Sequence, residues 1–203
     1  MRLPRTLSIR SATPFEPEYR PWSASSGLGA APRGKQLPPD VHTSSIAALM
    51  VFNEDALVFY QRLRGLVSTS MRREEKARSV CEAIREAGAY RWVGIYKVEA
   101  ERISVIGWSG PAAPTHSSFP VTQGLNGEAV RSARSVVVGD VRADPRYLTT
   151  LSSTRAEMVV PVSGGSSTVI GTIDVESEFA DSFTDADRRF VEGCAAAAAS
   201  LLH

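Results

Sequence analysis

The alternation of apolar and polar positions is clearest between residues 155 and 177. Two apolar runs flank the turn Ser163-Gly164-Gly165-Ser166, which predicts a β-hairpin. Side chains alternate along a strand, so Glu157 shares a face with Val159 and Pro161 in the first arm. In the second arm one face carries Ile170, Thr172, Asp174 and Glu176, and the other carries Val169, Ile173 and Val175. Two interpretations of the three carboxylates stay open: a solvent-exposed edge, or the negatively charged floor of a pocket that perturbs the acids.

Further periodic segments predict the rest of the fold. Helical spacing follows Asn53-Glu54-Asp55, which is typical of a helix start, whereas residues 44–52 fit either a short helix or a strand. The remaining elements are expected to be a helix from about 70 to 88, strands at 92–98, 103–108, 118–121 and 135–139, a short helix from Gly124 to about Arg131, and a final helix capped by Thr184 with Asp187. About six strands without βαβ alternation favour an α+β fold, an antiparallel sheet with helices on one face.

Composition divides the chain and narrows the class of protein. Residues 1–40 hold seven of the twelve prolines and are expected to be a disordered extension, followed by N-terminal helices over 41–88 and a domain core over 89–203. The net charge of +1 argues against binding to nucleic acid or to a membrane surface. No apolar run approaches the roughly 20 residues of a membrane span. Two cysteines are too few for a disulfide framework and suit a reducing cytoplasm.

Several motifs in series resemble the GAF domain. WVGIYKV, FPVTQGLNGEAV, SVVVGDVRADPRY, RAEMVVPV, VIGTIDVES and FTDADRRFVEGCA follow one another in the family's order between about residues 89 and 202. Within this superfamily the chain is most similar to the free methionine-(R)-sulfoxide reductases, whose acids match Glu157, Asp174 and Glu176. The resemblance implies loops that fold over the sheet face opposite the helices and enclose a ligand pocket.

The cysteines of those reductases are not matched in this chain. Their positions fall near Thr115 or His116, on Asn126, and within 149–152, none of which is a thiol. Cys81 and Cys194 lie on the apolar stripes of the predicted helices and are expected to be packed core residues. A hydroxyl cannot replace a thiolate that must be oxidised and recovered. The absence of these cysteines removes the sulfoxide reduction, but it does not necessarily remove the ligand pocket.

The candidate ligand-binding residues are the three acids together with side chains from the neighbouring loops: Trp108, His116, Asn126, Tyr147, Glu157, Asp174 and Glu176. An exposed loop histidine and aromatic packing are the simpler explanations for His116, Trp108 and Tyr147. The turn at 124–127 is either purely structural or a source of free N–H groups that attract an anion. No metal site or cofactor is expected.

The leading hypothesis is a GAF-type sensory module that binds a small zwitterionic metabolite and signals to a protein partner. A divergent sulfoxide reductase and a dimerisation scaffold with a vestigial pocket remain as alternatives. A homodimer is expected if the helices at 53–67 and 185–202 pair between subunits.

Overall fold

The computed structural model describes residues 41–165 and 168–203, with side chains from residue 54 onward. The expected disorder of residues 1–40 lies outside this range. The elements are α1 (Val41–Val67), α2 (Arg73–Gly88), β1 (Trp92–Glu99), β2 (Arg102–Ser109), β3 (Ser118–Pro120), α3 (Gly124–Ser132), β4 (Val136–Val138), the 3-10 turn η1 (Val141–Ala143), β5 (Ala156–Ser163), β6 (Val169–Ser177), α4 (Asp185–Ala198) and the 3-10 turn η2 (Ala199–Leu202).

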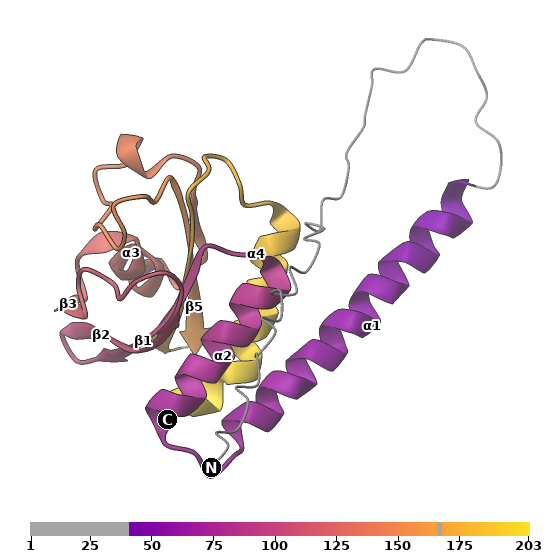
Figure 1. Cartoon of the computed structure of the whole chain (residues 1–203), viewed down its shortest axis with the longest axis horizontal. Helices are drawn as coiled ribbons and strands as arrows, with labels where there is room; N and C mark the ends of the chain where they lie inside the picture. The colour runs from indigo at the N-terminus through magenta and orange to yellow at the C-terminus, as the bar shows by residue number, and fades with distance from the viewer. Residues whose placement is uncertain (1–40, 166–167) are drawn as a thin grey trace, which may run out of the picture.

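The six strands form one antiparallel sheet in the order β3-β2-β1-β6-β5-β4. Helices α1, α2 and α4 lie on one side of this sheet, and α3 lies on the other side with the long loops (Figure 1). The predicted α+β architecture is therefore confirmed. The predicted hairpin is also present, with Glu157 opposite Glu176 and Val160 opposite Ile173.

The helix side of the sheet contains the main apolar core. Met158, Val160, Ile173 and Val175 point toward the helices and are each no more than 1% exposed. They meet the buried stripes of the helices, which include Leu63, Val67, Ala77, Val80, Cys81, Ile84, Val191 and Cys194. The prediction that both cysteines are packed core residues is confirmed.

Helix α1 begins twelve residues earlier than the sequence suggested, at Val41 rather than at Asn53. The predicted helix start at residues 53–55 is wrong, and the segment 44–52 is helical. No proline or glycine interrupts residues 41–64, and the apolar run contains alanine, leucine and methionine, which are strong helix formers. Residues 53–55 suit a helix N-terminus, but the helix does not start there because no residue before them interrupts it.

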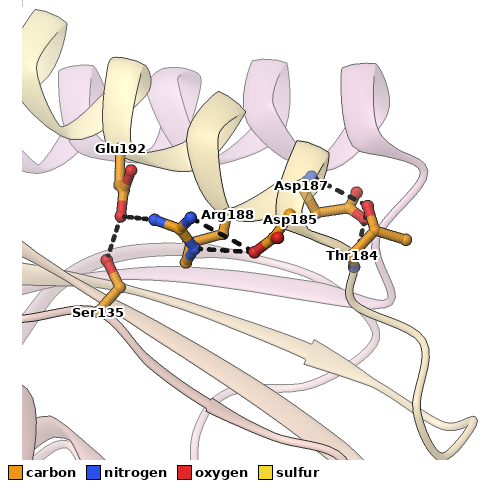
Figure 2. Close-up of polar contacts among 6 residues, drawn as sticks. All are labelled: Ser135, Thr184, Asp185, Asp187, Arg188 and Glu192. Atoms are coloured by element: carbon orange, nitrogen blue, oxygen red, sulfur yellow. Dashed lines mark hydrogen bonds and ion pairs between the residues drawn. The ribbon is translucent and has the colours of Figure 1, made fainter.

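The last helix is fixed at its start and along its flank (Figure 2). The Thr184 hydroxyl accepts the Asp187 N–H, and the Asp187 carboxylate accepts the Thr184 N–H, so the predicted capping box is confirmed. Further along, Glu192 accepts hydrogen bonds from Ser135 (2.7 Å) and Arg188 (2.8 Å). These contacts join α4 to the segment that enters β4.

The terminal helices pair within the chain. The Tyr60 hydroxyl of α1 donates to the Phe190 carbonyl of α4 at 3.2 Å, and the two rings lie 6.1 Å apart. A Cβ at Gly193 would come within 2.2 Å of the Tyr60 ring, so only glycine permits this approach. The faces expected to meet a second subunit are thus partly used inside one molecule. In the described part of the chain, no helix is long and apolar enough to cross a membrane.

Candidate functional site

Three carboxylates meet on the sheet face opposite the helices. Glu157 of β5 and Asp174 and Glu176 of β6 are 2%, 0% and 0% exposed, and each places a carboxylate oxygen within 4.8 Å of the others. Strand register explains the cluster, because Glu157 pairs with Glu176, and the neighbour of Asp174 on β5 is Val159. Of the two interpretations from sequence, the solvent-exposed edge is wrong. The acids are enclosed.

Neighbouring polar groups satisfy this cluster only in part. Asn126 Nδ2 donates to Asp174 Oδ2 at 3.0 Å, and Thr154 Oγ1 donates to Glu176 Oε2. Thr172 Oγ1 donates to Asn126 Oδ1, which fixes the orientation of the amide. One buried oxygen of each acid has no hydrogen-bond partner: Glu157 Oε2, Asp174 Oδ1 and Glu176 Oε1. Unsatisfied buried acceptors are costly, so three together mark this site.

Burial and mutual repulsion make the acids hard to ionise. Desolvation is the main cause that raises the pKa of Glu157 and of Asp174 well above the usual range, and repulsion from neighbouring carboxylates adds to it. Burial raises the pKa of Glu176 to about 7, although the Thr154 hydroxyl bond opposes the shift. The folded protein therefore binds protons at these acids more tightly than the unfolded chain does, and a bound cation would oppose that protonation.

Glu157 lines a small cavity together with Asn126, the hydrogen-bond partner of Asp174. Its volume is about 10 Å³, which is the space that one water molecule needs. Residues of the sheet, of α3 and of the loops line it: Tyr96, His116, Phe119, Gly124, Leu125, Asn126, Leu148, Thr149, Thr150 and Glu157. Two loops meet above it, where the Thr115 N–H (3.0 Å) and hydroxyl (2.8 Å) both donate to the Thr150 carbonyl.

The first turn of α3 forms another wall of the cavity. Gly124 opens this helix with φ +72°, a conformation that favours glycine, and a Cβ there would lie 3.2 Å from the Leu148 side chain. The first backbone bond of the helix is from the Gly127 N–H to the Gln123 carbonyl at 3.1 Å. The N–H groups of residues 124–126 precede it and have no intrahelical partner. The wall is therefore the positive end of a helix dipole.

Of the predicted residues His116, Tyr147 and Trp108, only His116 lines the cavity. His116 lines it from an otherwise exposed position. The hydroxyl of Tyr147 accepts the Thr150 N–H at 3.4 Å, and burial, with repulsion from Glu176 and Glu157, raises its pKa to about 12. Trp108 packs against the aromatic cluster beside the cavity and is not one of its lining residues.

Sequence reasoning missed two aromatic residues of β1. Trp92 and Tyr96 are buried on the acid face, directly opposite Glu176 and Thr172. The Trp92 ring occupies the space above Gly94, where a Cβ would lie 2.2 Å away, and its Nε1 donates to the Ala112 carbonyl at 3.1 Å. The signal was present in WVGIYKV, since Trp92, Gly94 and Tyr96 alternate along the strand.

A family model described as a GAF domain matches residues 70–203. The chain belongs to the GAF domain family. The resemblance inferred from its motifs is thereby confirmed, and the enclosed cavity on the face opposite the terminal helices lies where the resemblance placed the ligand pocket of a GAF domain.

Individual GAF proteins show the same relationship. The chain is 27% identical over 131 residues to GAF domain-containing protein A of Dictyostelium discoideum, which covers 64% of this chain and 81% of that protein. It is similar to the solved type II free methionine-R-sulfoxide reductase from Thermoplasma acidophilum, with 31% identity, a TM-score of 0.59, and coverage of 65% of this chain and 96% of that one. The reductase from Neisseria meningitidis in complex with its substrate is 25% identical, with a TM-score of 0.64 and coverage of 73% and 90%.

The two thiols of this GAF domain lie on the other side of the sheet from the acids. Cys81 donates to the Gly107 carbonyl at 3.4 Å in the core on the helix side, and burial raises its pKa. Cys194 is fully buried on α4, and burial raises its pKa too. Neither thiol lines the cavity.

The oxygen atoms of Glu157, Asp174 and Glu176 are also the ligand type that a hard cation such as Ca²⁺ prefers. Within the described residues they form a group that could hold a metal ion.

Proposed function

We propose that this GAF domain binds a small zwitterion that carries a primary ammonium group, with free amino acids as the class of ligand. One observation carries the proposal: each of three clustered acids has a buried oxygen without a partner, and one of these acids, Glu157, lines a cavity. A primary ammonium has three N–H donors, so the number of donors equals the number of buried carboxylate oxygens that lack a partner. Charge-assisted bonds of this type are about twice as strong as neutral ones.

The opposite wall supports a zwitterion over a simple amine. The free N–H groups at the start of α3 favour a carboxylate, and the helix dipole adds to this preference. Asn126 belongs to this first turn and also bonds Asp174, so one residue joins the two walls. A ligand with both charges a few ångströms apart would satisfy both ends of the cavity.

Binding must widen the cavity, because about 10 Å³ accommodates little more than the ammonium group. The contact between Thr115 and Thr150 is the place where the two covering loops can separate. Movement there would uncover Leu148 and Thr149, which line the cavity on the loop side. We expect the ligand side chain to lie among these loop residues and His116.

The regulatory output would pass through the helices. β5, which carries Glu157, packs under α4, and α4 packs on α1 through Phe190 and Tyr60. A shift of the acid-bearing strands therefore has a packed route to the terminal helices. A signalling protein partner that contacts those helices is part of the proposal.

Calorimetry with glycine, methylammonium, acetate and calcium chloride tests the binding proposal. We expect the affinity for glycine to exceed that for methylammonium, and acetate to bind weakest. Asp174→Asn keeps the shape and removes one charge, and it should weaken glycine binding by about 1–3 kcal/mol. Ile173→Val, a matched change on the other face of the same strand, should leave the affinity unchanged. Tighter binding of acetate, or of Ca²⁺ alone, would overturn the proposal.

The alternative is a reductase, which the similarity to free methionine-R-sulfoxide reductases favours. Turnover of free methionine sulfoxide with a thiol reductant, measured on the wild type and on the Cys81→Ser, Cys194→Ser double variant, separates the two. Thiol-dependent turnover would replace binding by catalysis as the function. The burial of both thiols in the core on the helix side supports binding.

A further inference from the structure

A groove of about 740 Å³ lies at the edge of the sheet, between α4, β5 and the segment that joins α3 to β4. This volume is within the range of ligand sites in proteins. None of the residues that line the groove also lines the cavity beside Glu157, so the groove is a separate site. Its helix wall is polar at one end and consists of small alanine side chains at the other: Arg188, Glu192, Ala195, Ala196 and Ala199.

The edge of the sheet is open along this groove. β4 has three residues and pairs only with residues 157–159 of β5, whereas β5 continues to Ser163. In the described part of the chain, residues 160–163 therefore have a neighbouring strand only on the β6 side. An unpaired edge of this length, roughly 13 Å, is a template for another extended chain. Pro161 suits such an edge because it has no N–H group to leave unpaired.

Arg134 gives the groove a positive charge that no acid compensates. The second arginine of the groove, Arg188, forms ion pairs with Glu192 (2.8 Å) and Asp185 (3.3 Å), and Ser135 donates to the same Glu192 (Figure 2). Arg134 is exposed, and its side chain forms no ion pair or hydrogen bond with any residue that the structure describes. A guanidinium group binds a carboxylate through two parallel N–H···O bonds. The charge of the groove is therefore complementary to an acidic chain.

We propose that this groove binds an extended acidic segment of a partner protein, which adds a strand to the open edge of β5 and places a carboxylate on Arg134. Strand addition combines main-chain hydrogen bonds, which give affinity, with contacts to alternate side chains, which give specificity. Every second side chain of the segment faces α4, where the alanines leave room for apolar groups. The partner thus contacts the helix that packs on α1. Binding in the groove does not require a ligand in the cavity beside Glu157.

Fluorescence anisotropy with two labelled, end-blocked peptides tests the charge preference on the full chain. Glu-Val-Glu-Val-Glu should bind about tenfold or more tightly than Lys-Val-Lys-Val-Lys, and Arg134→Glu should reverse this order. Arg189→Glu changes an exposed arginine of α4 that does not line the groove, and it should keep the wild-type order. Equal binding of the two peptides, or no reversal in Arg134→Glu, overturns the proposal. Because the assay contains no amino acid, its failure leaves the ligand proposal intact.

A second set of measurements tests the place and the mode of binding. Ala196→Trp fills the groove from an exposed position and should weaken binding of the acidic peptide by roughly tenfold, whereas Ala186→Trp, exposed on the same helix outside the groove, should not. The acidic peptide with N-methyl groups on alternate amides keeps its charges and loses main-chain donors, so it should also bind roughly tenfold more weakly.

Three outcomes would overturn the proposal. Equal binding of the N-methylated peptide would reduce the contact to an ionic one, and displacement of the peptide by an equal concentration of glutarate would make the groove a site for small anions. Loss of peptide binding as the protein self-associates, measured by light scattering, would place a second copy of the chain in the groove. Far-UV circular dichroism checks that each variant is folded.

Discussion

The two faces of β6 are equally buried and chemically opposite. Ile173 and Val175 face the helices, Asp174 and Glu176 lie on the other face, where Glu157 lines the cavity, and all four are 0% exposed. On the helix side these residues belong to the main apolar core, so burial removes hydrocarbon from water and stabilises the fold. On the cavity side burial removes carboxylates from water and opposes folding.

The two faces of the sheet therefore contribute differently to the stability of this domain. The apolar core on the helix side stabilises the fold, whereas the three buried acids on the other face oppose folding, and a bound cation would reduce that cost. Destabilised groups of this kind cluster at functional sites. Substitutions that change one face and leave the other intact test this difference.

The largest effect is expected on the helix side. Ile173→Ala leaves a cavity in a fully buried site and should lower the free energy of unfolding by about 2–5 kcal/mol. Asp174→Asn, the next residue along, should raise the free energy of unfolding at pH 8, because the folded protein no longer has to bury or protonate this carboxylate. Urea titration of both variants at pH 8 measures the contrast. Equal destabilisation by the two would show that the faces do not differ.

The second effect is a dependence of stability on pH that originates on the cavity side. The pKa of Glu176 is raised to about 7 in the folded protein, so the folded state binds this proton more tightly than the unfolded chain does. Stability is full below the ordinary glutamate pKa and falls as pH rises through about 7, by on the order of 3 kcal/mol. Glu157 and Asp174, with raised pKa values, act in the same direction.

Glu176→Gln should flatten this dependence. Unfolding free energies measured from pH 5 to pH 8 provide the comparison, and Ile173→Val, which keeps all three acids, is the control. If the wild type became more stable between pH 5 and pH 8, the acids would be ionised and compensated in the folded protein.

A smaller effect is expected from the hydrogen bond that orients Asn126. Thr172→Val keeps the shape of the side chain and removes the hydroxyl that donates to Asn126 Oδ1. The unfolding free energy should fall by about 1 kcal/mol, and glycine affinity should fall with it because the amide no longer holds Asp174 in place. Thermal unfolding and calorimetry measure the two quantities. A loss of stability without any loss of affinity would make the bond structural only.

The smallest effect is expected at the covering loops. Thr115→Val removes one of two hydrogen bonds to the Thr150 carbonyl and keeps the backbone bond. Stability should change by less than about 1 kcal/mol, whereas glycine should associate and dissociate a few-fold faster. Stopped-flow fluorescence of Trp92, which is tied to the same loop through Ala112, would report the rates. Unchanged rates would place the entrance elsewhere.

Local pattern was enough to predict several features. The period of two placed Glu157 on one face of its strand and Asp174 with Glu176 on one face of theirs, and the Thr184 capping box marked the start of α4. Hydrophobic spacing identified the buried stripe of α2, including Cys81. These features depend on residues a few positions apart, so the sequence alone determines them.

Tertiary structure decided the rest, because the remaining contacts join residues far apart in the chain. Asn126 meets Asp174 across 48 positions, and Trp92 lies opposite Glu176 only because β1 pairs with β6. No local period encodes that pairing, nor the closure of two loops that turns an acidic strand face into a buried site. The sequence could therefore name the three acids, and only the packed sheet could show that each keeps one oxygen without a partner.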